Sequence, residues 1–307
     1  MNIACITVFC NERFRLENWI CFYSEYKEDI SLHIIVNNGD VKDTDLLRQS
    51  FPNSVVLESE GGNLLKAYNV GTSYALNYSD VDAIMQITND VRFESGAIKK
   101  LYELLFSDEK LAVVGPVLLK SDSQIVESYG IDYQGWRHYR GGGQKYPYSG
   151  QDLESIKEIV RRTTYVPAGT ILQKRSAIEK MGLQDDTMNM YCDERDMFIR
   201  LDRLGYYEAV TINAKAWHQH INRPGYTNRS LFAPFYSSRN GIYLVHKHAN
   251  LFWAALESVR VLLYEFLLVF YHLINWEPEK LQFDRAVIAG TCYGLLNIMN
   301  SLPRWLR

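Results

Sequence analysis

The chain has 307 residues, a formal net charge of −3 at pH 7 and a sequence pI near 6.2. This length fits one α/β catalytic domain with an appendage, since such domains often run to about 200–250 residues as a single unit. The slightly acidic balance excludes a broad nucleic-acid-binding surface, because binding to phosphate backbones depends on clustered Lys and Arg.

The N-terminal segment 3–9 is an apolar run that is typical of a buried first strand. No charged region or small-residue cleavage site of a signal peptide precedes it. The five cysteines are widely spread without CxxC spacing, which predicts free thiols rather than a disulfide framework or a zinc site. We therefore expect a cytoplasmic protein.

Strand-like and helix-like patterns alternate along the N-terminal part of the chain. Strands are predicted at 3–9, 32–36, 54–58 and 83–87, and helices at 14–26, 43–51 and 63–78. This alternation predicts an α/β fold with a mostly parallel central sheet flanked by helices. Because ligands of open α/β sheets bind at the carboxyl ends of strands, the turn signals after two of these strands predict a nucleotide-sized cleft. GxGxxG and P-loop motifs are absent from the sequence.

Two carboxylate-bearing stretches are the main chemical signals. Thr88-Asn89-Asp90-Val91 places a carboxylate directly after the apolar strand predicted at 83–87. Asp193-Glu194-Arg195-Asp196 places three carboxylates within four residues, ahead of a helical pattern. The first stretch can hold a divalent metal, and the second can supply a base.

Between these stretches, the segment 136–167 has weak periodicity and many aromatic residues around Gly141-Gly142-Gly143. Such a segment is either a loop that faces the substrate or a plain surface excursion. Residues 165–172 then predict a strand with a glycine break, and 175–181 predict a helix.

Further short motifs occur in a fixed order with these two stretches. In chain order they are Asn11-Glu12-Arg13, Val36-Asn37-Asn38-Gly39-Asp40, Ala67-Tyr68-Asn69-Val70-Gly71, Thr88-Asn89-Asp90-Val91, Ala168-Gly169-Thr170 with Arg175, Gly182-Leu183, Asp193-Glu194-Arg195-Asp196 with Arg200 and Gly205, Ala216-Trp217-His218, and Tyr236-Ser237-Ser238-Arg239-Asn240. The set resembles the family-2 glycosyltransferases, which are inverting enzymes with a GT-A-type (Rossmann-like) nucleotide-diphosphosugar fold. The last two motifs are similar to segments of bacterial polysaccharide members, including rhamnosyl- and galactofuranosyltransferases.

The resemblance runs from residue 1 to about residue 245. It implies a GT-A-type glycosyltransferase domain over 1–245 and leaves 246–307 as a C-terminal helical region for membrane association or oligomerisation.

A sugar diphosphate gains negative charge at its β-phosphate when the sugar leaves, so Mg²⁺ or Mn²⁺ with oxygen ligands suits the reaction. Asp90 is the expected ligand. Thr88 and Asn89 stand where carboxylates are common in the family, so the diphosphate itself would supply more of the metal's ligands, with Asn89 contacting the donor. The resemblance makes His218 a second ligand, and imidazole suits Mn²⁺ better than Mg²⁺. The alternatives are a packed histidine at 218 and His220 as the ligand.

An inverting transfer needs a base that deprotonates the acceptor hydroxyl during attack. Like-charged neighbours raise the pKa of a carboxylate, which makes it a better proton acceptor. The resemblance assigns this role to Glu194, with Asp193 as the alternative, and Asp196 either orients the acceptor or pairs with Arg200. The competing interpretation is an acidic first turn of a helix without catalytic meaning.

The donor nucleotide is expected on the first strand, with Asn37 contacting the base by resemblance. Asn63 and Lys66 can reach the diphosphate, or they form an ordinary capped helix start. The segment around Arg239 either contacts the diphosphate or closes over the cleft. Besides Asn89, the predicted donor-binding residues are Thr7, Val8, Glu12, Asn37, Asn63, Lys66 and Arg239.

The tail differs in kind, because Leu251–Ile274 is almost wholly apolar. Its apolar residues at helical spacing, with Trp253 and Trp276 near the ends, predict a helix that lies on a membrane surface. A buried oligomerisation or core helix and a membrane span are the alternatives.

The sequence therefore predicts a metal-dependent inverting hexosyl- or deoxyhexosyltransferase that uses a nucleotide-diphosphosugar donor. Its expected acceptor is a saccharide, lipid-linked if the tail binds membrane, in the synthesis of a surface polysaccharide such as O-antigen or capsule, at the inner face of the cell membrane. The alternatives are a non-catalytic sugar-nucleotide-binding or scaffold protein, favoured by the single Asp at 88–90, and a nucleotidyltransferase of similar fold. No nucleic-acid partner is expected, and the chain can form a homo-oligomer.

Overall fold

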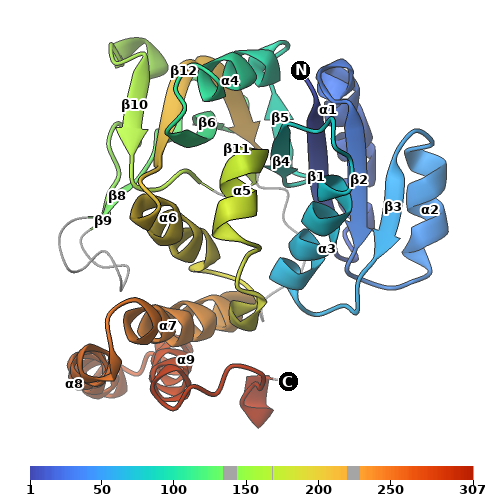
Figure 1. Ribbon diagram of the computed structural model, residues 1–307. Helices are drawn as coiled ribbons and strands as arrows, with labels where there is room; N and C mark the ends of the chain where they lie inside the picture. Colours follow the sequence, from blue (N-terminus) through green and yellow to red (C-terminus); the bar gives the residue numbers. More distant parts are fainter. Residues whose placement is uncertain (134–143, 168, 220–228, 307) are drawn as a thin grey trace. The chain divides into compact units, whose positions relative to one another are not determined.

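The structure, a computed structural model, describes residues 1–133, 144–167, 169–219 and 229–306 (Figure 1). These residues form two compact units. The sheet unit contains the described residues of 1–133, 144–189 and 197–219, and the helical unit contains those of 190–196 and 229–306. The helical unit thus contains residues 190–196 and 229–245 in addition to the predicted C-terminal region.

Ten strands of the described chain form the central sheet of the sheet unit. Its order is β10-β12-β6-β11-β4-β1-β2-β3, with β5 paired to β12 and β7 to β6. Neighbours from β4 to β3 are parallel, as are β6 and β12, whereas β11 is antiparallel to β4 and β6. The strands are β1 (Ile3–Phe9), β2 (Leu32–Asn37), β3 (Val55–Glu58), β4 (Ala83–Ile87), β5 (Val91–Phe93), β6 (Leu111–Lys120), β7 (Val126–Ser128), β10 (Val160–Thr163), β11 (Thr170–Lys174) and β12 (Tyr207–His218).

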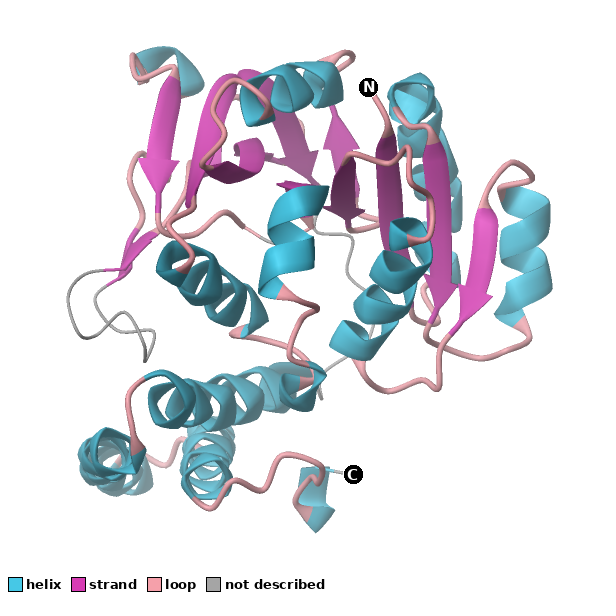
Figure 2. Cartoon of the chain, in the orientation of Figure 1, coloured by secondary structure: helices cyan, strands magenta, loops and turns pink. Residues whose placement is uncertain are grey.

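Helices cover both faces of this sheet (Figure 2). Because strand side chains alternate between faces, Ile3 and Cys5 of β1 pack in one cluster with α4, and Ala4 and Ile6 pack in another with α3. The helices of the sheet unit are α1 (Leu16–Tyr26), α2 (Asp43–Ser50), α3 (Leu64–Leu76), α4 (Ala97–Leu105), α5 (Arg175–Met181) and, from Met197 onward, α6 (Asp193–Arg203). The predicted α/β class with a mostly parallel sheet is confirmed.

The predicted elements of the first ninety or so residues lie within one or two residues of the observed ones. The first helix starts later than predicted because Arg13–Arg15 form a 3₁₀ turn ahead of it. The strand predicted at 165–172 begins only at Thr170, after Gly169, which has a φ of +77°. A residue in this left-handed region cannot continue an extended strand, so the predicted glycine break delays the strand's start.

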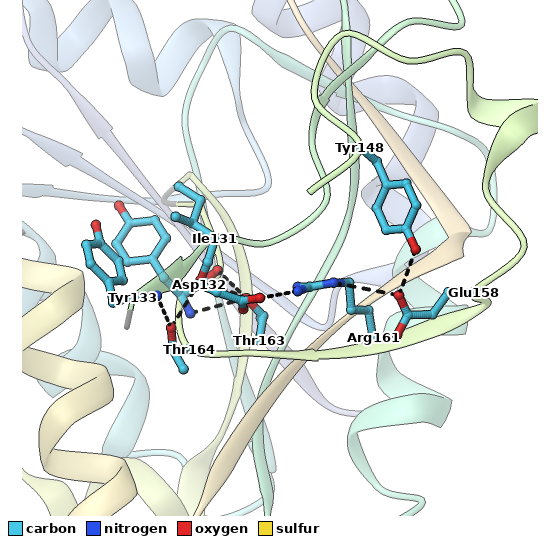
Figure 3. A network of polar contacts seen from close by, with 9 residues as sticks. Ile131, Asp132, Tyr133, Tyr148, Glu158, Arg161, Thr163 and Thr164 are labelled. Atoms are coloured by element: carbon cyan, nitrogen blue, oxygen red, sulfur yellow. Dashed lines mark hydrogen bonds and ion pairs between the residues drawn. The ribbon is translucent and has the colours of Figure 1, made fainter. Parts of the chain in front are cut away.

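The predicted aromatic segment lies partly outside the described residues, which omit 134–143. Its two described flanks form a short ribbon of β8 (Asp132–Tyr133) and β9 (Gln144–Lys145). Figure 3 shows Arg161 between the carboxylates of Asp132 and Glu158, and Tyr148 donates to Glu158 at 3.2 Å. Polar contacts with β10 therefore fix the base of this segment to the sheet.

The helical unit is built from α7 (Arg229–His248), α8 (Leu251–Ile274) and α9 (Pro278–Leu295). Two glycines of α9 allow a close approach to α7, because a Cβ at Gly290 or Gly294 would collide with the carbonyl oxygens of Phe235 or Arg239. In the described parts of the chain, none of the helices combines the length and apolarity that crossing a membrane requires.

Candidate functional site

The first group of predicted site residues lies at the carboxyl ends of two neighbouring parallel strands, β1 and β4. Glu12 follows β1, and Asn89 and Asp90 follow β4. Asn89 Nδ2 donates to Glu12 Oε2 at 2.7 Å, which ties the two loops together. Arg15 lies between them, with Nη1 3.1 Å from Asn89 Oδ1 and 2.9 Å from Asp90 Oδ2. Arg15 was not predicted, although its spacing of three residues from Glu12 in a turn allows both to face one point.

The third element of this group is the end of β12. β12 pairs antiparallel with β5, and this register sets His218 opposite Val91, next to Asp90. His218 Nε2 lies 3.5 Å from Asp90 Oδ2, and its Nδ1 lies 3.1 Å from Glu127 Oε1 on β7. Glu127 was not predicted, because only strand pairing brings β7 to this edge. We call Glu12, Arg15, Asn89, Asp90, Glu127 and His218 the Asp90 cluster.

Opposite charges alternate through this cluster and set its ionisation. Burial opposes ionisation of Asp90, but a hydrogen bond from His218 and the positive charges of Arg15 and His218 outweigh it and lower the Asp90 pKa. Burial likewise opposes protonation of His218, but Asp90 and Glu127 outweigh it and raise the His218 pKa to about 9. The carboxylate of Asp90 is therefore an anion whose counter-charges are already in place.

The donor atoms of the Asp90 cluster fit a divalent cation in part. A carboxylate oxygen and an imidazole nitrogen that face each other at 3.5 Å are ligand types that Mn²⁺ accepts. Within the described residues, no set of three or more His, Cys, Asp or Glu side chains is arranged to hold a metal. Asp90 and, once its ring has released the Nε2 proton, His218 would thus supply two ligands, and a bound diphosphate would have to supply others.

Three more of the predicted donor residues lie in the neighbouring strands β1 and β2. Thr7 and Val8 are buried in β1. Asn37, at the end of β2, is engaged by its own turn, since Nδ2 donates to Asp40 O and Thr44 Oγ1.

Two further predicted donor residues lie at the start of α3. Asn63 caps this helix through the backbone N–H of Lys66 at 3.0 Å, and its Nδ2 donates to Asp186 O at 2.7 Å. The Lys66 ammonium pairs with Glu60 at the surface. These contacts are those of a capped helix start, the alternative that the sequence left open for both residues.

The second group of predicted residues lies in the helical unit, in what we call the acidic segment, residues 190–196. Asp193 begins α6, and Asp193 and Glu194 are both buried. Burial, together with the charge of Glu194, raises the Asp193 pKa well above its usual range. Tyr191 and Cys192, directly before them, have φ values of +64° and +65°. Left-handed backbone at two successive non-glycine residues is costly, and residues of this kind cluster at functional sites.

Asp196 is held by α7 through two residues that sequence reasoning missed. Its Oδ1 lies 2.7 Å from Lys247 Nζ and 2.8 Å from His248 Nε2, and the side chain has no solvent exposure. Arg200, the predicted alternative partner of Asp196, donates through Nη1 to the carbonyl oxygens of Met181 and Leu183. Nothing in the sequence links positions 196 and 247, because their contact depends on how the helical unit packs.

Arg239 is the last of the predicted donor residues and belongs to the helical unit. It is 1% exposed, with Nη1 donating to Met299 O at 2.7 Å and Nε to Asn240 Oδ1 at 3.0 Å. Contact with a donor would require this burial to be relieved. The predicted fallback ligand His220 and the glycines at 141–143 lie outside the described residues.

No protein-family model and no curated protein sequence matches this chain. Solved structures with a similar fold include GalNAc-T7 with UDP, GalNAc and Mn²⁺, with a TM-score of 0.59 at 10% identity over 80% of this chain. The chain spans only 48% of that protein's length. The mannosyltransferase PcManGT from Pyrobaculum calidifontis, in complex with GDP-Man and Mn²⁺, has a TM-score of 0.56 at 11% identity, covering 96% of this chain and 87% of the other. At these identities the likeness establishes the fold, which is the predicted GT-A type.

Proposed function

We propose that this chain transfers a sugar, with inversion, from a nucleotide-diphosphosugar to a saccharide acceptor, as a family-2 type glycosyltransferase. The observation that carries the proposal is the Asp90 cluster, a set of charged side chains at the carboxyl ends of β1 and β4 in a GT-A fold. This edge of an open α/β sheet is where ligands bind. The two similar structures were solved with UDP or GDP-Man and Mn²⁺, which supports a nucleotide-sugar donor with a divalent metal.

In this proposal Asp90 and His218 hold Mn²⁺ or Mg²⁺ together with the donor diphosphate. When bound, the cation supplies positive charge against the negative charge that the departing nucleotide diphosphate develops. An ion pair with Arg15 holds the Asp90 carboxylate in place, and Glu127 holds the His218 ring through Nδ1. Thr7, Val8, Glu12, Asn37, Asn63, Lys66 and Asn89 remain the proposed donor contacts.

Glu194 is the proposed base, with Asp193 as its alternative. Two adjacent buried carboxylates cannot both ionise easily, and the raised pKa of Asp193 follows from this. A carboxyl group whose pKa is raised binds a proton more strongly, which suits a site for proton transfer. The base would accept the proton of the acceptor hydroxyl as that oxygen attacks the anomeric carbon and the bond from this carbon to the nucleotide diphosphate breaks.

Helix α8 supports a lipid-linked acceptor, because its polarity is inverted. A helix on a protein surface normally buries apolar residues and exposes charged ones. In α8 the buried side chains include Glu257, Ser258, Glu265 and His272. The exposed large apolar side chains are Leu251, Phe252, Trp253, Leu256, Val259, Leu263, Tyr264, Phe266, Leu267, Phe270, Tyr271, Leu273 and Ile274.

Three of the four inward polar groups of α8 have partners, since His272 and Glu257 are in ion pairs and Ser258 Oγ donates to Ala254 O, whereas Glu265 Oε2 is buried without a hydrogen bond to any described residue. His272 Nδ1 lies 2.7 Å from Asp284 Oδ2 on α9, and Glu257 accepts from Arg260. The outer face carries Arg260 and no exposed carboxylate, which suits an apolar layer under anionic headgroups. Trp276, 90% exposed just after α8, suits the headgroup depth. We infer that α8 lies on the cytosolic face of a membrane, where the chain would extend a lipid-linked surface polysaccharide.

The test measures the melting temperature with UDP-, dTDP- and GDP-linked sugars, each with and without Mn²⁺. A ligand that binds only the folded state stabilises it by about 2.7 kcal/mol at a concentration one hundred times its Kd. We expect a metal-dependent rise with one nucleotide class, followed by transfer whose product has the inverted anomeric configuration by NMR. A rise without transfer to any lipid-linked or soluble saccharide would favour the non-catalytic interpretation, and no rise with any donor would refute the proposal.

A further inference from the structure

Helix α7 contacts the acidic segment at several points along its length. Ser237 O lies 3.8 Å from Cys192 Sγ, and Asn240 Nδ2 reaches two backbone carbonyls of the segment. Lys247 and His248, two turns further on, both reach Asp196. Residues 237, 240 and 247 follow helical spacing, so they share one side of α7. This side of α7 therefore binds both ends of the acidic segment.

Asn240 makes the most specific of these contacts. Its Nδ2 donates to Met190 O at 2.7 Å and to Tyr191 O at 2.9 Å. Its Oδ1 accepts from Arg239 Nε at 3.0 Å. Because a guanidinium can only donate, the arginine fixes which way the amide points and directs both N–H groups at the carbonyls. Asn240 has no solvent exposure, so water cannot replace these bonds.

Arg239 is itself anchored within the helical unit. Its Nη1 donates to Met299 O at 2.7 Å, and its guanidinium lies over the ring of Tyr236 at 4.6 Å. Two donor groups of Arg239, Nε and Nη1, are therefore engaged in hydrogen bonds within the helical unit. Its place in the sequence, one residue before Asn240, is explained by this orienting contact.

The contacts from α7 lie next to the strained backbone of the acidic segment and at its far end. Tyr191 and Cys192 have left-handed backbone, which the chain adopts only when its surroundings enforce it. Asn240 binds the carbonyls at the start of this strained stretch. Lys247 and His248 bind the carboxylate of Asp196 at the other end of the acidic segment. Asp193 and Glu194 lie between the two attachment points.

We propose that Asn240, oriented by Arg239, and the pair Lys247 and His248 are positioning residues that hold Asp193 and Glu194 in their working geometry. The inference rests on the proposed function for what those two carboxylates do. It gives Asp196 the part of an attachment point and Arg239 that of an orienting group.

The experiment replaces Asn240 by Asp. The carboxylate has the shape of the amide and keeps the oxygen that faces Arg239. Its second oxygen replaces Nδ2, so an acceptor then faces the two backbone carbonyls and both hydrogen bonds are lost. We expect kcat to fall about tenfold or more while the donor KM stays within about twofold, because the donor is bound elsewhere. Asn77→Asp, the same change at an exposed site that ends α3, is the matched control and should leave both constants unchanged.

A second readout does not depend on activity. Cys192 is half-buried, and desolvation raises its pKa to about 11, so this thiol should react slowly with a maleimide while the segment is held. Peptide mapping by mass spectrometry separates it from the exposed Cys10 and Cys21. In Asn240→Asp we expect labelling of Cys192 about tenfold faster, with unchanged circular dichroism.

The outcomes separate the two proposals. If the wild-type chain transfers no sugar, the proposed function fails, and faster Cys192 labelling in the variant still supports the positioning role. Wild-type labelling of Cys192 in Asn240→Asp, together with a wild-type kcat if the chain transfers sugar, would overturn the positioning role. Should this variant fail to fold, Lys247→Gln, which acts at the other attachment point on a partly exposed side chain, is measured in the same two ways with the same expected directions.

Discussion

Arg15 and Asp90 form a buried ion pair, with Nη1 2.9 Å from Oδ2, that joins the loops after β1 and β4. The same nitrogen lies 3.2 Å from Glu12 Oε1 and 3.1 Å from Asn89 Oδ1. One guanidinium group therefore compensates two carboxylates at the edge of the sheet where the donor is proposed to bind. A carboxylate that is fixed and ionised before the donor arrives needs little rearrangement to bind a cation.

Replacing Arg15 by Met keeps the volume of the side chain and removes its charge. We expect the free energy of unfolding, measured by urea denaturation, to fall by about 3 kcal/mol, because the buried carboxylate of Asp90 loses one of its two counter-charges and the half-buried carboxylate of Glu12 loses its ion pair. Arg48→Met is the control, since Arg48 forms an exposed pair with Asp45 at 3.1 Å and should contribute less than about 1 kcal/mol. Equal decreases in the free energy of unfolding in the two variants would contradict the prediction that the buried Arg15 pair contributes more than the exposed Arg48 pair.

Asp90→Ala and Glu194→Gln should impair transfer at different steps. The first removes a proposed metal ligand, so the Mn²⁺-dependent rise in melting temperature with donor should disappear. The second keeps donor binding but removes the base, which should lower kcat by about 10²–10⁴-fold. Near-full turnover in Glu194→Gln would exclude Glu194, and loss of turnover in Asp193→Asn alone would move the base to Asp193.

The sheet and the positions of its strand ends could be predicted because they depend on local patterns. β1 and β4 are apolar runs of the right length, and Asp90 comes three residues after the end of β4, so its place at the sheet edge follows from the sequence. Arg15 and Glu127 could not be predicted as partners of Asp90 and His218. Their contacts depend on the pairing of β7 with β6 and on the turn after β1, which no periodicity encodes.

The acidic segment shows a second limit. Three carboxylates ahead of a helix are visible in the sequence, but the left-handed backbone of Tyr191 and Cys192 is not, because neither residue type favours it. The partners of Asp196 lie some fifty residues away on a helix whose packing depends on two glycines of α9. Tertiary packing, and not local preference, decides both features.

Glu208 in β12 makes stability depend on pH. Burial, with a contribution from Asp202, raises the Glu208 pKa from 4.5 to about 8. Between these values the unfolded chain is ionised at this position while the folded chain holds the proton, so the free energy of unfolding falls as pH rises. Relative to wild type, Glu208→Gln should gain stability on the order of 3 kcal/mol between pH 5 and pH 8, because the amide never ionises. Parallel curves for the two proteins in urea titrations across this range would contradict the prediction.

The outer face of α8 should carry the proposed membrane binding, and the double variant Leu263→Asp with Phe270→Asp tests it. Both side chains are more than 60% exposed, so the change should leave the fold intact. Each large apolar side chain that enters the interface contributes about 1.5–3 kcal/mol, so co-sedimentation with anionic phospholipid vesicles should weaken at least tenfold.

Val41→Asp, at an equally exposed residue of the sheet unit, is the control for this double variant and should bind vesicles like wild type. Transfer to a water-soluble acceptor should remain unchanged in all three proteins, since α8 contributes nothing to the proposed chemistry. If the wild type sediments as a dimer in the ultracentrifuge, binds no vesicles, and becomes monomeric in the double variant, a second copy of this chain covers α8, and the membrane proposal fails.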